Sequence, residues 1–143
     1  ISLGGRRNRL HQSIDVSIAD LATFMRPTLT VVDGVRVMMR NGPQGGNIDD
    51  TQRMNTVIAT IDQVAADAFG CTLIGQRPEN LPYLRMGQER HLGTMQWQTL
   101  RPREVALLDD GTIERRVIHV PEGEDPAAVA FALNHARQSL VMT

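Results

Sequence analysis

The sequence predicts an α/β domain with a small, mostly parallel sheet, flanking helices, and a C-terminal β-hairpin followed by a helix. Two apolar, β-branched runs, 29–32 and 56–61, each adjoin a helical pattern, which is typical of strands covered on both faces. Farther along, Asp110-Gly111 separates two more apolar runs, and this pair supplies the positive φ angles of a tight hairpin turn. With 143 residues, 41% of them hydrophobic, the chain can bury one core.

The first helix is predicted over residues 10–25. Its apolar residues recur at helical spacing: Ile14, Ile18, Leu21 and Met25. Pro27 ends this helix, because the proline ring lacks a donor and disfavours helical geometry in the residue before it.

The connection between the two apolar runs, residues 37–55, is long and has no convincing helical period. Parallel neighbours need a crossover connection, and each run lies next to a helix, so we expect the two strands to pair in parallel. Structureless loops of this length are uncommon in compact domains unless they bind something. The connection is therefore the first place to look for a ligand.

The second half of the chain repeats the alternation of elements. A helical stripe follows Asp62, with Gly75 as its C-terminal cap, and a short helix is predicted over residues 81–90. The hairpin runs from Val105 to Val120, and a last helix begins at Asp125-Pro126. We divide the chain into residues 1–105 and a hairpin–helix extension, 106–143, packed on them.

Charge and composition exclude several classes of function. A net charge of −1 and a pI near 6.5 give no reason to expect nucleic acid or a membrane as partner. All fifteen basic residues are arginine. The absence of lysine excludes a Schiff-base lysine, a Walker-type phosphate lysine and a lysine general base in this chain.

The single cysteine, Cys71, cannot form an internal disulfide or hold an iron–sulfur cluster, which needs about four thiolates. No apolar run approaches the roughly twenty residues of a membrane span. We expect a cytoplasmic location. Because the chain begins with Ile1 and not Met, we also expect a fragment of a longer protein, which leaves an upstream export signal as the alternative.

The strongest candidate site is the glycine cluster Gly42, Gly45 and Gly46. Such a cluster lets the backbone approach a ligand and point several N–H groups at an anion. The glycine spacing is not that of a dinucleotide fingerprint, and a P-loop needs lysine. The competing interpretation is a glycine-rich turn without a ligand.

Three aspartates are candidate ligand or metal residues. Asp33 and Asp62 follow the two predicted strands, where open α/β sheets build their ligand crevices. Paired carboxylates there could bind a divalent cation or act as acid and base, although capping the next helix is sufficient reason for Asp62. Asp67 lies on a mostly apolar helix surface and needs a partner if buried, either an arginine or a metal.

Histidine offers no metal signature, because none of the four forms a His-x-His or His-Glu-x-x-His pair. We expect His91 to be a surface residue.

The order of these pieces resembles the C-terminal half of the "domain of unknown function 362" family. The resemblance is carried by Val31-Val32-Asp33-Gly34, the Gly-Pro-x-Gly element within 41–46, and the stretch 56–70, and it covers about residues 4–105. Asp67 matches a family aspartate. The family reads Asp-Pro where this chain has Asp62-Gln63, so the cap is kept and the rigid proline is lost.

Because the family is sometimes fused to ferredoxin-type iron–sulfur segments, the resemblance implies a soluble enzyme-like or redox-associated module. It would bind a small anionic ligand or a metal at the strand ends, with Gly42, Gly45, Gly46, Asp33 and Asp67 as the ligand-binding residues. Any metal or cluster would be supplied by missing or partner segments, and the upstream half of the protein or a partner chain would complete the site. The alternative is a non-catalytic structural or assembly module of a larger redox protein.

Overall fold

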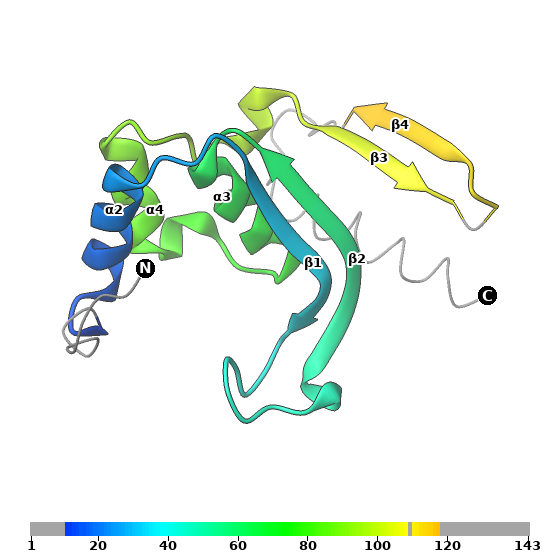
Figure 1. The fold of residues 1–143 in the computed structure, drawn as a ribbon, viewed down its shortest axis with the longest axis horizontal. Helices are drawn as coiled ribbons and strands as arrows, with labels where there is room; N and C mark the ends of the chain where they lie inside the picture. Colours follow the sequence, from blue (N-terminus) through cyan, green and yellow to red (C-terminus); the bar gives the residue numbers. More distant parts are fainter. Residues whose placement is uncertain (1–10, 109, 118–143) are drawn as a thin grey trace.

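A computed structural model describes residues 11–108 and 110–117. Within them the elements follow in the order helix, hairpin, two helices, hairpin (Figure 1). The helices and strands are α2 (Ile14–Phe24), β1 (Thr30–Met38), β2 (Thr51–Thr60), α3 (Gln63–Leu73), α4 (Pro82–Glu89), β3 (Arg103–Leu107) and β4 (Ile113–Val117). Short 3-10 helices occupy Ile48–Asp50, Pro78–Asn80 and Trp97–Leu100.

The predicted parallel sheet is wrong, because β1 and β2 form an antiparallel hairpin. Their register runs from Thr30 opposite Thr60 to Met38 opposite Thr51. The apolar runs are only the first part of β1 and the second part of β2, and both strands continue through polar residues. Both ends of the predicted crossover, residues 37–38 and 51–55, are thus strand, and the true connection is the shorter stretch of residues 39–50.

The hairpin bends where its register shifts, between Gly34 and Arg36. On β2 the irregularity lies beside Asn55, whose φ of 48° is in the left-handed region that asparagine tolerates better than most residues.

The core is built around α3. Its buried face packs against α4 and the 3-10 helix that begins at Trp97, and one edge-to-face ring pair, Phe69 with Trp97, has centroids 4.9 Å apart. The core residues are Val64, Ala65, Ala68, Cys71, Leu84 and Trp97. Helix α3 also covers one face of the β1–β2 hairpin, since a Cβ at Gly34 would meet Leu73 and one at Gly70 would meet Ile58.

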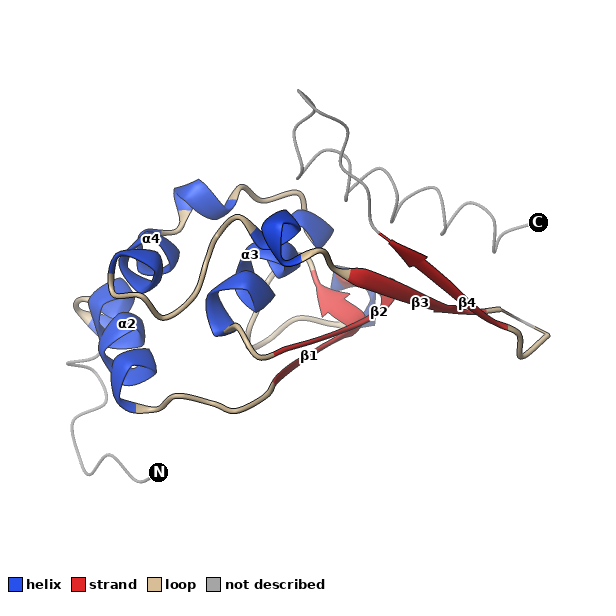
Figure 2. Cartoon of the chain, turned by 90° about the horizontal axis from the view of Figure 1, so that it is seen from above, coloured by secondary structure: helices blue, strands red, loops and turns tan. Residues whose placement is uncertain are grey.

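The helices lie together at one end of the molecule and the β3–β4 hairpin at the other (Figure 2). The predictions of helices at 10–25, after Asp62 and at 81–90 are confirmed, and Gly75 ends α3 with a φ of 67°. Among the described residues, no helix is long and apolar enough to cross a membrane.

The predicted C-terminal hairpin is confirmed as the antiparallel pair β3–β4, with Gly111 at a φ of 83° in its turn. The helix predicted from Asp125 lies outside the described residues. The division at 105/106 falls within β3, and it stays a prediction.

Candidate functional site

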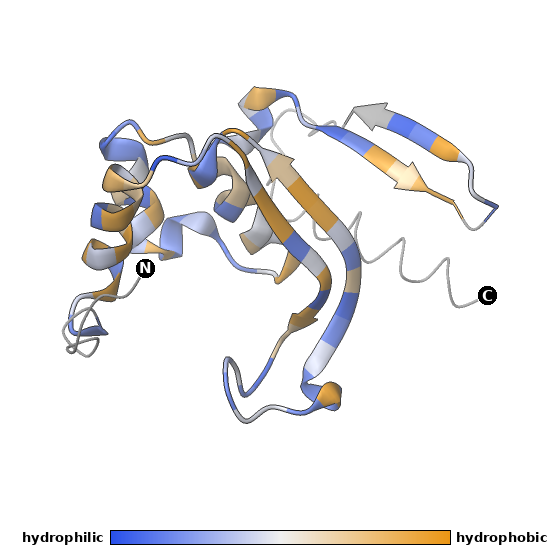
Figure 3. Cartoon of the chain, viewed as in Figure 1, coloured by the Kyte–Doolittle hydropathy of each residue, from blue (hydrophilic) through white to orange (hydrophobic). Residues whose placement is uncertain are grey.

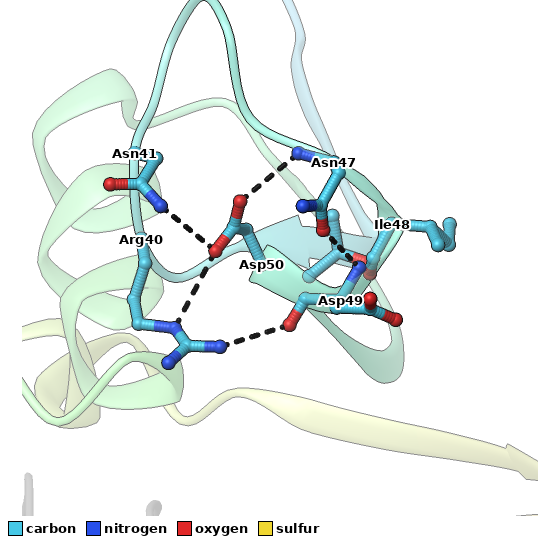
Figure 4. A network of polar contacts seen from close by, with 7 residues as sticks. Arg40, Asn41, Asn47, Ile48, Asp49 and Asp50 are labelled. Carbon is cyan, nitrogen blue, oxygen red and sulfur yellow. Dashed lines mark hydrogen bonds and ion pairs between the residues drawn. The ribbon is translucent and has the colours of Figure 1, made fainter.

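The loop that carries the glycine cluster is held by one buried carboxylate, that of Asp50, which is 7% exposed (Figure 4). The Asn47 backbone N–H and the Asn41 side-chain amide each donate to this carboxylate over 3.0 Å. The Arg40 Nε lies 3.7 Å from it. The Asn47 and Asn41 hydrogen bonds, with the Arg40 charge, hold the pKa of Asp50 below its ordinary value. One side chain therefore ties the two ends of the loop together.

A second set of bonds closes the same loop from the backbone. The Met39 N–H donates to the Asp50 carbonyl over 2.8 Å, and the Asp49 N–H donates to the Asn47 side-chain oxygen over 2.8 Å. Asn47 and Asp50 thus form a capping box for the 3-10 helix Ile48–Asp50. These bonds give the loop a defined shape.

Each glycine of the cluster has a local reason to be glycine. A Cβ at Gly42 or at Gly46 would lie 3.0 Å from the Met38 side chain, so both glycines let the loop fold over that side chain. Gly45 has a φ of 88°, which side chains rarely adopt, although a Cβ there would meet nothing. These reasons favour the turn interpretation and leave the anion-binding role a prediction.

Asp33 lies within β1, opposite Val57, and not at the end of a strand. Its carboxylate accepts a 2.9 Å hydrogen bond from the Val35 N–H, two residues on, at the point where the register shifts. It lies three residues along β1 from the Thr30–Thr60 pair, or roughly 10 Å at 3.3 Å per residue. The parallel sheet that would have placed Asp33 beside Asp62 does not exist.

Asp62 caps α3, as the cap interpretation predicts. One carboxylate oxygen accepts from the Ala65 N–H over 2.8 Å, and the other accepts from the Thr94 N–H over 3.0 Å. A Cβ at Gly93 would overlap this carboxylate. Asp62 therefore joins the start of α3 to the segment after α4, and Gly93 is what lets that segment approach.

An open depression of about 610 Å³ lies beside Asp62. It is lined by the end of β2, by residues 91–93 and by Leu100. His91 is exposed at this depression, as expected of a surface histidine, and has a φ of 56°. Both carboxylate oxygens of Asp62 already accept backbone hydrogen bonds. The groups that remain to contact a ligand in this depression are therefore the His91 imidazole and mostly apolar side chains.

Asp67 is exposed on α3, and the side chain bonded to it is Tyr83 of α4 and not an arginine. A metal partner stays a prediction. Desolvation raises the pKa of the Asp67 carboxyl, and the hydrogen bond from the Tyr83 hydroxyl opposes that rise. Burial, with the Asp67 charge nearby, raises the pKa of the Cys71 thiol to about 11. A buried, protonated thiol is a poor nucleophile and a poor ligand.

The structure therefore does not bring the predicted site residues together. The glycine loop, Asp33, Asp62 and Asp67 lie in four separate settings, and in the described part of the chain no group of three His, Cys, Asp or Glu side chains could hold a metal ion. A lone buried thiol does not fit an iron–sulfur cluster, so this chain would need ligands from elsewhere.

Sequence reasoning missed three residues that organise these settings. Asp50 could have been found from the Asn47-x-x-Asp50 spacing, which is that of a capping box. Tyr83 and Gly93 carry no local signal, because their roles depend on contacts with residues far away in the sequence.

The structure is thus a domain of helices and antiparallel hairpins, in which polar side chains such as Asp50 and Asp62 hold a loop and cap a helix. A family model with the description "Domain of unknown function (DUF362)" matches residues 1–72, and the chain belongs to this family. The predicted membership of the family is thereby confirmed over residues 1–72, and the resemblance predicted for residues 73–105 stays a prediction. No curated protein and no solved structure matches the chain.

Proposed function

We propose that this chain is a non-catalytic assembly module of a larger protein, in which a β-strand from the rest of that protein adds to the β1–β2 hairpin. The observation that carries this proposal is the pair of open strand edges of that hairpin, beside an exposed outer face. Val31 and Val57 are 59% and 62% exposed, and they lie on the face opposite α3. Both strands are also free of further strand partners among residues 11–108 and 110–117.

A two-stranded hairpin needs packing on a helix or further strands to be stable in water, and here α3 covers only one of its faces. An open strand edge invites another strand. Figure 3 shows hydrophobic residues on the half of the hairpin beside α3 and more hydrophilic ones toward the far end of β2. An added strand would contact the hydrophobic half. Apolar side chains of the added strand would pack beside Val31 or Val57 on the same face, which contributes about 25 cal/mol for each Å² of apolar surface removed from water.

The local roles of the aspartates support the same proposal. Asp33 bonds to its own turn, Asp62 caps a helix, and Asp67 bonds to Tyr83. Each carboxylate has a structural role that requires no substrate.

The test is hydrogen exchange of the full-length protein, followed by mass spectrometry. We expect the outward-facing amides of β1 or β2 to be protected in the wild type and to exchange several-fold faster in Val57→Arg. Val105→Arg is the matched control, because Val105 is a similarly exposed valine on the other hairpin. Rapid exchange of those amides in the wild type, or protection that survives Val57→Arg, would contradict the proposal.

A second candidate function, binding of a small anion at residues 41–46, is favoured by one observation. Within the part of the chain that the structure describes, the backbone N–H groups of Gly45 and Gly46 have no hydrogen-bond partner. The Arg40 side chain, 70% exposed, lies at the base of this loop. Preorganised N–H groups beside a cation suit phosphate or carboxylate.

Titration with inorganic phosphate, followed by NMR of the loop amides, tests this second candidate. Saturable shifts at Gly45 and Gly46 that disappear in Arg40→Gln would support it, and unchanged amides would reject it. The metal or iron–sulfur cofactor from other segments stays a prediction, which elemental analysis of the protein purified without oxygen would test.

A further inference from the structure

The apolar stripe of α2 is only partly covered by the domain. Ile14, Ile18, Leu21 and Met25 are 36–46% exposed, whereas Ala19, on another face, is buried. The contacts that hold α2 in place come from that other side. They include the 2.8 Å ion pair between Asp20 and Arg90 of α4 and the hydrogen bond from Arg90 to Thr23.

The spacing of the stripe is that of a helix–helix seam. Its members are separated by four, three and four residues, the alternation found at the a and d positions of a coiled coil. The stripe is also symmetric about its own middle. If a two-fold axis passes between Ala19 and Asp20, Ile14 lies opposite Met25 of a second copy and Ile18 lies opposite Leu21 of that copy.

Charge complementarity selects the same arrangement. Asp15 lies in the first turn of α2 and Arg26 directly after its C-cap. In an antiparallel pair, Asp15 of each copy comes within about one turn of Arg26 of the other, whereas in a parallel pair like charges would lie side by side. Antiparallel helix dipoles also attract one another.

We propose that a second copy of this chain docks on α2 through an antiparallel, two-fold pairing of the Ile14–Met25 stripe. Because α2 has only eleven residues, about 16 Å, the interface is smaller than a standard one, and we expect a weak dimer with a Kd above about 1 µM. The hairpin surface of the proposed function takes no part in it, so either proposal can fail alone.

Sedimentation velocity over about 10 µM to 1 mM protein tests the pairing. We expect concentration-dependent dimerisation that weakens at least about tenfold in Leu21→Glu, because two carboxylates would then be buried in the seam. Val16→Glu is the matched control, because Val16 has the same 40% exposure as Leu21 and lies on a different face of α2. A monomer at all concentrations, or equal weakening by both variants, would overturn the proposal.

Disulfide trapping tests the direction of the pairing. In a Cys71→Ala background, the variants Ile14→Cys and Met25→Cys are oxidised separately and as a mixture. Antiparallel pairing predicts a covalent dimer in the mixture and little in either variant alone. Dimers of each variant with itself, or no dimer in the mixture, would contradict it.

Discussion

The α3–α4 core and the far end of the β1–β2 hairpin are held together in different ways. In the core, buried apolar side chains such as Leu84 and Trp97 exclude water around α3. At the hairpin end, a single carboxylate, Asp50, gathers hydrogen bonds and a guanidinium around a loop of glycines. The core therefore determines whether the chain folds, whereas Asp50 determines only the shape of one projecting loop.

The largest expected effect is that of Trp97→Ala, which tests the core. Trp97 is 4% exposed and packs edge-to-face on Phe69, so its truncation should destabilise the chain by about 3–5 kcal/mol. Urea denaturation followed by circular dichroism measures this loss. Val57→Ala on the exposed hairpin face should change stability by less than about 0.5 kcal/mol. Equal losses would remove the distinction between core and hairpin.

The junction between the core and the hairpin is tested next, at Asp62. Asp62→Ala removes a helix cap and the bond from Thr94, for an expected loss of about 1–2 kcal/mol. Gly93→Ala should also destabilise, because its Cβ would overlap the Asp62 carboxylate. The double variant should lose less than the sum of the single losses, since removing the carboxylate makes room for the methyl group. Additive losses in urea denaturation would mean that the two residues do not interact.

Asp50→Ala tests the hairpin loop. It should accelerate amide exchange several-fold in residues 39–50 and leave exchange in α3 unchanged, because only the loop depends on that carboxylate. The pKa of Asp50 is lowered in the folded chain. The stability that its carboxylate contributes is therefore present above the ordinary pKa of 3.8 and is lost as pH falls through the pKa of the folded chain. The protection of the wild-type loop amides, relative to their intrinsic exchange rates, should therefore fall below about pH 4. Faster exchange throughout α3 in the variant would show that the loop and the core are coupled.

The smallest expected effect concerns Asp67 at the edge of the core. The pKa of Asp67 is raised in the folded chain. Its contribution to the free energy of unfolding is therefore full below the ordinary pKa of 3.8 and declines as pH rises through the pKa of the folded chain. Asp67→Asn keeps an acceptor for the Tyr83 hydroxyl and removes the group whose ionisation causes that decline. The stability of the variant, relative to that of the wild type, should therefore rise from acid to neutral pH. Urea denaturation at several pH values measures the difference.

Asp110→Asn provides the matched control for Asp67. The pKa of Asp110 is lowered by its hydrogen bonds with Thr112 in an exposed turn, so its pH dependence should have the opposite sign. The same sign in both variants would contradict the assigned causes.

The sequence predicted the local elements well and their pairing badly. Periodicity identifies α2 and α3 because a helix buries one stripe of its own residues, and Asp110-Gly111 identifies the second hairpin through its turn. The prediction of parallel pairing failed because β1 and β2 continue through polar residues such as Arg36 and Gln52. Those parts of the strands lack the apolar pattern by which a strand is identified in a sequence. Apolar runs next to helices look the same in parallel and antiparallel sheets.

The candidate site shows the same limit. The cap role of Asp62 follows from its place before a helix, which local sequence reveals. The bond from Tyr83 to Asp67 and the approach of Gly93 to Asp62 are tertiary contacts, and single-sequence patterns contain no information about them.

Hydrogen exchange of the β1–β2 amides is the most direct test of the assembly proposal. It would be measured by mass spectrometry on the 143-residue chain alone and on the protein purified from the cells that make it. The assembly proposal predicts that outward-facing amides of residues 30–34 or 56–60 exchange rapidly in the chain alone and are protected in the purified protein, while α3 exchanges equally in both. Identical exchange of the hairpin in the two samples would contradict it.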